Sequence, residues 1–343
     1  MRFAVGYQMA EEGEEPFSAL LSDYREHIAE VYFPWMGMAS GRSPLSVRRG
    51  YANWTAQEQL EDDLRAFRAM GMELDLLFNA NCYGGRAISL HLQNEIASIL
   101  EHLQAVVGGV DIITTTSPAV AHMVKEHFPE VRVRASVNMR IGTIKGMQYV
   151  ADLFDAFHVQ REHNRDLDYL RELKAWADEH GKTLTMLANS GCMNHCSGQS
   201  FHDNLVAHEA EIAETRNIEG WIPHACWRYL RDPANWPSIL QNSWVRPEDL
   251  HHYEGIFSVV KLATRMHQRP RMVLEAYTKR RYHGNLLDLM EPGYSPALAP
   301  RIMNNDAFPE EWFERTSRCD RRCYRCDYCA RVLEQVLTAP EAF

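Results

Sequence analysis

Short apolar runs rich in β-branched and aromatic residues alternate with amphipathic stretches along most of the chain. In the stretches between the runs, such as QLEDDLRAFRAMG and LDYLRELKAWADEHG, apolar residues recur at spacings of three and four, which is typical of helices. Repeated strand–helix units predict a parallel sheet, and eight of them predict an α/β fold, the (β/α)8 or TIM barrel. The eight runs predicted as strands are residues 3–8, 28–35, 73–79, 110–117, 131–138, 156–160, 184–190 and 257–265.

The length of the chain fits one barrel with an appendage. A typical barrel takes about 250 residues, and this chain has 343. We expect a barrel domain over residues 1–285, followed by a linker and a cysteine-rich C-terminal tail over 286–343. The connection between the last two strands, residues 191–255, is far longer than a usual βα loop, so we expect it to hold an inserted substructure.

Several predicted strands finish in polar residues. In a barrel, this end carries the active site, because the loops there are free to hold chemistry. Arginine suits an anionic substrate, since its guanidinium can pair with a carboxylate through two hydrogen bonds, and histidine exchanges protons near neutral pH. At any single position, the alternative is an ordinary turn or loop-orienting residue. The residues expected to bind substrate are Asn138, Arg140, Asn189 and Arg265, and those expected to act in catalysis are Arg161 and His202.

Charge and hydropathy limit the kinds of binding partner and the cellular location that we expect for the protein. The net charge of −10 argues against a broad nucleic-acid surface, although six arginines around the tail leave an RNA contact open beside the simpler interpretation of solvated charges. No apolar run is long enough to span a membrane, so we expect a cytoplasmic protein. In that compartment, clustered cysteines bind metal more often than they form disulfides.

The eight cysteines predict a metal cofactor, either iron–sulfur or zinc. Cys192, Cys196 and Cys226 belong to the long connection, where His195, His202 and His208 would be further zinc ligands. The tail contributes four more, and its arginines are expected to lower the thiol pKa values and so favour thiolate ligands. The tail resembles a radical-SAM motif, but it follows the complete barrel instead of preceding it, which argues against that class. The four tail cysteines are Cys319, Cys323, Cys326 and Cys329.

Cys82 is the eighth cysteine, and the sequence does not decide which cysteines together bind each metal centre. In the simplest division, Cys82 completes the set of Cys192, Cys196 and Cys226, and the tail holds a second centre by itself. Alternatively, one tail cysteine completes the first set, and Cys82 is a free thiol or a ligand of the tail centre.

Several short motifs in residues 130–285 resemble peptidase family U32: SVNMRI, DAFHVQREHNRDLDYLREL, LANSGCMNHC followed by FHDN, CWRY, ILQNSWVRPEDL and VVKLATR. The resemblance implies a TIM barrel with a 4Fe-4S cluster on Cys192, Cys196 and Cys226, and places Arg161, Glu162 and Arg265 in recurring family positions. Members of the family include oxygen-independent hydroxylases of tRNA, ribosomal RNA and ubiquinone, or their assistants. This chain departs from the family pattern in three places: KLATR replaces KIEGR, His251 replaces a common cysteine, and the tail is additional.

These observations predict an iron–sulfur oxidoreductase that hydroxylates or similarly modifies a small anionic metabolite or an RNA base. One 4Fe-4S cluster is expected at the barrel mouth and a second in the tail, where it would relay electrons from a donor protein. One alternative is a non-catalytic iron–sulfur partner of a hydroxylase complex. Another is a peptidase, although no GxSxG or HExxH motif is present.

Overall fold

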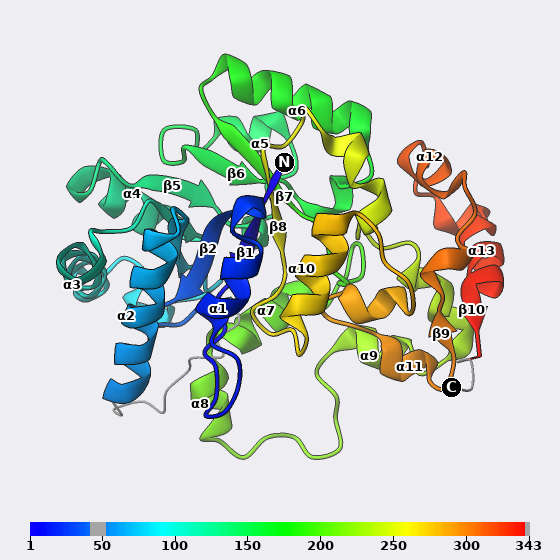
Figure 1. Cartoon of the computed structure of the whole chain (residues 1–343), viewed down its shortest axis with the longest axis horizontal. Coiled ribbons are helices and arrows are strands. Elements are labelled where there is room, and N and C mark those ends of the chain that lie inside the picture. The colour runs from blue at the N-terminus through cyan, green and yellow to red at the C-terminus, as the bar shows by residue number, and fades with distance from the viewer. Residues whose placement is uncertain (42–52, 340–343) are drawn as a thin grey trace.

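The computed structural model describes residues 1–41 and 53–339 and contains a closed barrel of eight parallel strands (Figure 1). Each strand pairs with the next along the chain, and β8 closes the barrel by pairing with β1. The α/β barrel prediction is therefore confirmed. The strands are β1 (Arg2–Gly6), β2 (Ile28–Pro34), β3 (Glu73–Phe78), β4 (Ile112–Thr115), β5 (Arg132–Ala135), β6 (Ala156–His158), β7 (Thr183–Leu187) and β8 (Val259–Leu262).

Amphipathic helices surround the barrel and turn their apolar sides toward it. In the second helix, for example, Leu60, Leu64 and Phe67 are fully buried. Five of these helices begin with a side chain that accepts a hydrogen bond from a first-turn N–H group, which explains where they start. The helices are α1 (Phe17–Asp23), α2 (Trp54–Ala69), α3 (Leu90–Val107), α4 (Pro118–His127), α5 (Ile144–Gln148), α6 (Leu167–Glu179) and α10 (Pro270–Lys279).

The strands end earlier than the sequence pattern suggests. The predicted strand 131–138 stops at Ala135, and Asn138 lies in a short 3-10 helix after it. Likewise Arg161 begins a 3-10 helix three residues after β6, and Arg265 follows β8 by the same interval. The polar residues thus lie in the loops beyond the strands, where their backbones are free of the sheet.

The interior of the barrel contains a buried charge network that the sequence analysis did not predict. Arg134 on β5 donates two hydrogen bonds to Glu30 on β2, at 2.6 and 2.8 Å, and lies 3.4 Å from Asp75 on β3. Lys261 on β8 and the fully buried His158 on β6 are electrostatically coupled to this network. Burial raises the pKa of Asp75 to about 6, and burial keeps His158 neutral by lowering its pKa.

The long connection between β7 and β8 holds the inserted substructure that was expected. It contains α7 (Gln199–Ala207), α8 (Glu209–Ala213), α9 (Ala225–Tyr229) and two 3-10 helices, η5 (Pro233–Ile239) and η6 (Pro247–Tyr253). After α10 the chain forms α11 (Ser295–Leu298), β9 (Ile302–Met303), α12 (Trp312–Ser317), α13 (Tyr328–Val336) and β10 (Leu337–Thr338). Residues 340–343 of the predicted tail lie outside the described part of the chain.

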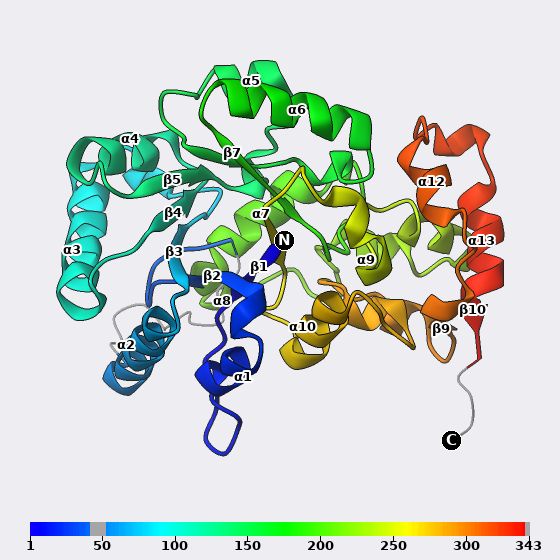
Figure 2. The same ribbon diagram turned by 45° about the horizontal axis from the view of Figure 1, so that its top comes forward.

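The tail forms a small unit at one side of the barrel, where α13 packs against η5 and β10 pairs with β9 (Figure 2). Within the described residues, no helix combines the length and apolar character needed to cross a bilayer.

Arg165 joins the barrel to this unit. Its guanidinium is buried, stacks on Trp244 and Trp312, and donates hydrogen bonds of 2.8 to 3.0 Å to the backbone oxygens of Trp244 and Leu240. We expect Arg165→Lys to lower the free energy of unfolding by about 2–3 kcal/mol, because an ammonium replaces neither the fork of donors nor the stacking. Denaturant unfolding measures the loss, and limited proteolysis should show earlier cleavage within residues 300–339.

The control for this prediction is Arg171→Lys on the exposed side of α6. Arg171 pairs with Asp168 at 2.8 Å, but both side chains are more than half exposed. Exposed ion pairs contribute little, so this change should leave stability almost unaltered. Equal losses in the two variants would contradict the role given to Arg165.

Candidate active site

A cavity of about 130 Å³ opens at the carboxyl ends of the barrel strands. Its walls come from the loops after β3, β5, β6, β7 and β8 and from α7, which the long connection folds across the mouth. Four of the residues predicted for substrate binding or catalysis line this mouth cavity: Asn138, Arg161, His202 and Arg265.

Arg161 links the mouth cavity to the first cysteine. The Arg161 Nη1 atom donates to Ser190 Oγ at 3.2 Å, and the guanidinium also hydrogen-bonds Cys192. Burial opposes the charge on Arg161, but Cys192 and Glu162 outweigh it and hold the pKa of Arg161 above its ordinary value. This side chain therefore stays cationic at the wall of the cavity.

Two more basic groups reach the same cavity. Arg265 Nη1 lies 3.4 Å from Ser40 Oγ, and the Lys261 ammonium lies 3.7 Å from the centre of the Tyr32 ring at the buried side of the cavity. Burial lowers the pKa of Lys261 to about 8. The carboxylates of Asp203 and Glu291 also line this space, so it offers both cations and anions to a ligand.

Arg140 and Asn189 do not line this cavity. Arg140 pairs with Asp203 at 2.8 Å and lies beside Ser200 on α7, so it holds that helix across the mouth. Asn189 is fully buried, and its amide bonds the backbone of Ala263 and Leu289. Both residues thus position neighbouring elements of the fold. This is the alternative role, that of a turn or loop-orienting residue, given above for the polar residues after the strands.

Cys192 also lines a second cavity, of about 320 Å³, together with Cys196 and Cys226. The two cavities share His202 and Glu291 as well, so the cysteine set adjoins the barrel mouth. Burial raises the pKa of Cys226, and this thiol hydrogen-bonds Tyr294. The structure therefore brings together the three cysteines of the long connection.

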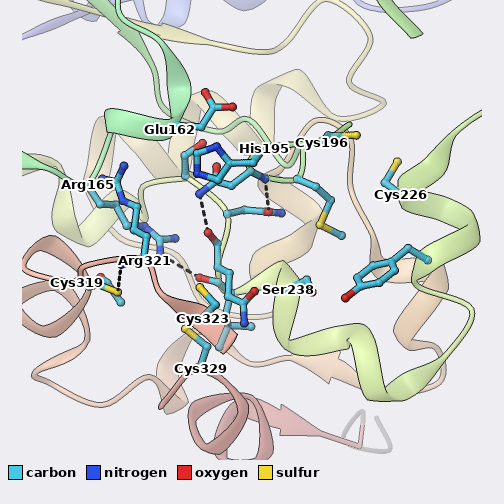
Figure 3. A pocket seen from close by; sticks show the side chains of 18 of the residues that line it. Glu162, Arg165, His195, Cys196, Cys226, Ser238, Cys319, Arg321, Cys323 and Cys329 are labelled. Atoms are coloured by element: carbon cyan, nitrogen blue, oxygen red, sulfur yellow. Dashed lines mark hydrogen bonds between the residues drawn. The ribbon is translucent and has the colours of Figure 1, made fainter. Parts of the chain in front are cut away.

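A third cavity, of about 520 Å³, separates the barrel cysteines from the tail cysteines (Figure 3). Cys196 and Cys226 line it from the barrel side, and three tail cysteines line it from the other. Cys326 lines a further cavity of about 660 Å³ with the other three tail cysteines. All four tail thiols are electrostatically coupled, so the tail cysteines form a second local set: Cys319, Cys323, Cys326 and Cys329.

Neither cysteine set has the compact geometry of a single-ion site. Among the described residues, no group of three or more His, Cys, Asp or Glu side chains is arranged to hold one metal ion. The thiolates of a 4Fe-4S cluster bind different iron atoms and need not converge on one point. A set of thiols around a shared cavity is the donor chemistry that such a cluster uses.

The expected lowering of the tail thiol pKa values is wrong for two of the four cysteines. Burial raises the pKa of Cys323, and it raises the pKa of Cys329 to about 12. The neighbouring thiols add to the effect of burial in both cases. The tail arginines are also partly neutralised by carboxylates. The paired arginines are Arg318 with Glu314, Arg322 with Asp320, Arg331 with Asp327 and Arg321 with Asp166.

Cys82 lies apart from both sets. It lines a pocket of about 440 Å³ where α7 passes into α8, with His208 and Glu211. Its hydrogen-bond partners are His208 and the backbone N–H of Gly84, and no other cysteine is among the described residues that line this pocket. The division that assigned Cys82 to the barrel set therefore has no support in the geometry.

The segment predicted as a linker contributes residues that the sequence analysis missed. Glu291 and Tyr294 reach the cysteine cavity because residue 291 pairs with Ser190 in a parallel bridge. A side chain at Gly191 would bring its Cβ within 2.0 Å of the Pro292 backbone oxygen, so only glycine allows this close approach next to Cys192. In the sequence, the glycine directly before Cys192 was the available signal that another segment of backbone approaches closely there.

Two comparisons connect the chain to known proteins. An uncharacterised protease of Methanocaldococcus jannaschii is 23% identical over 291 residues, which cover 82% of each chain. The solved structure of the U32 peptidase Mk0906 superposes with a TM-score of 0.52 over 77% of this chain and 92% of its own, at 15% identity, which shows a shared fold. The chain is thus similar in sequence to the Methanocaldococcus protease and shares the barrel fold of the U32 peptidase Mk0906. No family model matches the chain.

The departures from the U32 pattern fall at defined places in the fold. His251, where family members commonly have a cysteine, lies in η6 and lines none of the three cavities that hold the barrel and mouth residues. Ala263, in the altered KLATR motif, lines the mouth cavity, and its backbone N–H donates to Asn189 at 2.6 Å. The motif thus keeps its place at the mouth without the family carboxylate.

Proposed function

We propose that this protein is a member of the U32 family and an iron–sulfur oxidoreductase that acts on a small anionic substrate, by oxygen-independent hydroxylation or a related modification. The observation that carries the proposal is the position of Cys192, which lines both the mouth cavity and the cavity of the barrel cysteines. A cluster held there would lie directly beside a substrate in the barrel mouth.

The residues of the site divide into two roles. Cys192, Cys196 and Cys226 would hold the barrel cluster, and the four tail cysteines a second one. When bound, such clusters supply one-electron transfer. Arg161 and Arg265 would bind the anionic group of the substrate through charge-assisted hydrogen bonds. His202, at the boundary of the two cavities, would exchange a proton with the substrate.

The tail cluster would serve as the entry point for electrons from a donor protein. Three of its cysteines face Cys196 and Cys226 across one cavity, so the two sets are neighbours. The pairing of tail arginines with carboxylates favours a small-molecule substrate over RNA, since RNA binding depends on unpaired positive charge. A cluster-bearing subunit without catalytic activity would need a partner protein, and the mouth cavity with its three cations favours an enzyme.

A peptidase is the second candidate, because the Methanocaldococcus relative is named an uncharacterised protease and Mk0906 a U32 peptidase. Hydrolysis by the barrel site would need an activated nucleophile, whereas its three cysteines are assigned to the cluster. Casein and gelatin digestion by the anaerobically purified protein tests this candidate.

Anaerobic purification followed by iron and sulfide quantification tests the oxidoreductase proposal. We expect about eight irons and eight sulfides per chain, and an EPR signal typical of reduced 4Fe-4S clusters after dithionite treatment. About four irons would leave one cysteine set without a cluster. Zinc alone would contradict the proposal.

A further inference from the structure

Cys82 is part of a thiol–imidazole–carboxylate arrangement outside the cluster site. Its thiol hydrogen-bonds the His208 imidazole, and His208 Nδ1 lies 2.7 Å from Glu211 Oε2. Because Nδ1 is engaged by the carboxylate, Nε2 is left to face the thiol. The backbone N–H of Gly84 donates to Cys82 Sγ at 3.3 Å, which adds a second polar contact to the sulfur.

Two distant segments build this arrangement. Cys82 lies in the loop after β3, and His208 and Glu211 lie where α7 passes into α8. Gly84 has a left-handed backbone, with φ of +56°, and a Cβ added there would lie 3.9 Å from His208 Cε1, an ordinary van der Waals distance. The turn after Cys82 thus fits against the imidazole.

The pocket around these groups is open to a ligand of moderate size. Its volume is about 440 Å³, and small residues such as Gly37, Ala39 and Ala210 line it. Glu209 and Glu214 add carboxylates, while Arg86 is paired with Glu95 at 2.9 Å. The pocket therefore favours a neutral or amine-bearing group over an anion, in contrast to the mouth cavity.

We propose that Cys82 is a nucleophile that takes the acyl group of a small ester, with His208 as its base and Glu211 as the group that orients the imidazole. The thiolate attacks the carbonyl carbon, the ester C–O bond breaks, and the imidazolium of His208 protonates the leaving alcohol. Water then loses a proton to His208, attacks the thioester carbon and releases the acid and the thiolate.

The proton distribution supports this assignment. The hydrogen bond to His208 lowers the pKa of Cys82, and the same bond raises the pKa of His208. A thiolate is the reactive form of cysteine, and a neighbouring imidazolium is a common means of stabilising it.

The test uses the anaerobically purified full-length protein and p-nitrophenyl acetate. We expect a burst of nitrophenolate and an acetyl adduct that peptide mapping places on Cys82. Cys82→Ser should remove both, and His208→Asn should slow carbamidomethylation of Cys82 by iodoacetamide at pH 7 by about tenfold. Glu211→Gln should slow the nitrophenolate burst.

The matched controls are His283→Asn and Asp306→Asn. His283 Nδ1 lies 2.8 Å from Asp306 Oδ1 on an exposed surface, which reproduces the histidine–carboxylate pair without a cysteine partner. Both controls should react like the wild type. An adduct on another cysteine, or an unchanged carbamidomethylation rate in His208→Asn, overturns the proposal.

Iron content separates this inference from the cluster proposal. We expect Cys82→Ser to keep the full iron content of the wild type. A loss of iron in that variant would make Cys82 a cluster ligand and would also overturn its role as a nucleophile.

Discussion

Cys192→Ser is expected to remove the proposed barrel cluster and to abolish the proposed oxidoreductase activity. A serine hydroxyl is a poor iron ligand beside thiolates, so the iron content should fall from about eight to about four per chain. Cys192 lines the mouth cavity as well as the cysteine cavity, and no other cysteine of the described residues lines both. Iron and sulfide analysis, EPR and turnover with reduced methyl viologen measure the effect.

Cys323→Ser in the tail is the matched control for this prediction. It should also remove about four irons, yet turnover with methyl viologen, which delivers electrons directly, should persist because the barrel cluster remains. Turnover with a ferredoxin-type donor should be lost. If Cys192→Ser keeps both its iron and its activity, the barrel cysteines do not hold the working cluster.

Arg134→Met is expected to lower the free energy of unfolding by about 3–5 kcal/mol, because it leaves the Glu30 carboxylate buried without its partner. The pair is almost fully enclosed, with side-chain exposures of 5% and 1%, and Asp75 lies beside it. Arg134 counteracts the effect of burial and holds the pKa of Glu30 below its ordinary value. Denaturant unfolding at pH 7 measures the loss.

Arg132→Met provides the control two residues earlier on the same strand. Arg132 pairs with Glu73 at 2.6 Å, but both side chains are nearly half exposed, at 48% and 45%. Its removal should cost no more than about 1 kcal/mol. The double variant Glu30→Gln with Arg134→Met should recover much of the stability, since it removes the uncompensated charge; the absence of any recovery would contradict this explanation.

The periodicity of apolar residues was sufficient to predict the barrel. Each of the eight predicted runs overlaps one strand, because strand cores in a barrel are buried and leave a clear pattern. The same pattern extended the strands too far. Residues such as Asn138 and Arg161 follow apolar stretches directly, and only the barrel curvature decides where hydrogen bonding between strands stops.

The cysteine sets were predicted in part. Local spacing brought Cys192 close to Cys196 and joined the four tail cysteines, since residues a turn apart in sequence stay close in space. The position of Cys82 depended on where α7 and α8 cross the loop after β3, which no local pattern encodes. A single cysteine without neighbours therefore could not be assigned to a set from the sequence.

The charged residues in the barrel interior show a second limit of prediction from the sequence. Glu30, Asp75 and Arg134 interrupt apolar strands, and alternation alone would have permitted them to face either the barrel interior or the surrounding helices. Their pairing joins strands that are up to 104 residues apart in sequence. Only closure of the barrel brings these charges together.

The bridge between Ser190 and Glu291 determines where the chain can be truncated without loss of the cysteine cavity. A chain cut at residue 285 would retain all eight strands but lose Glu291 and Tyr294, and with them one wall of the cysteine cavity. The segment after the barrel therefore belongs to the same structural unit as the cysteine cavity, and a fragment that keeps this cavity must extend at least through residue 294.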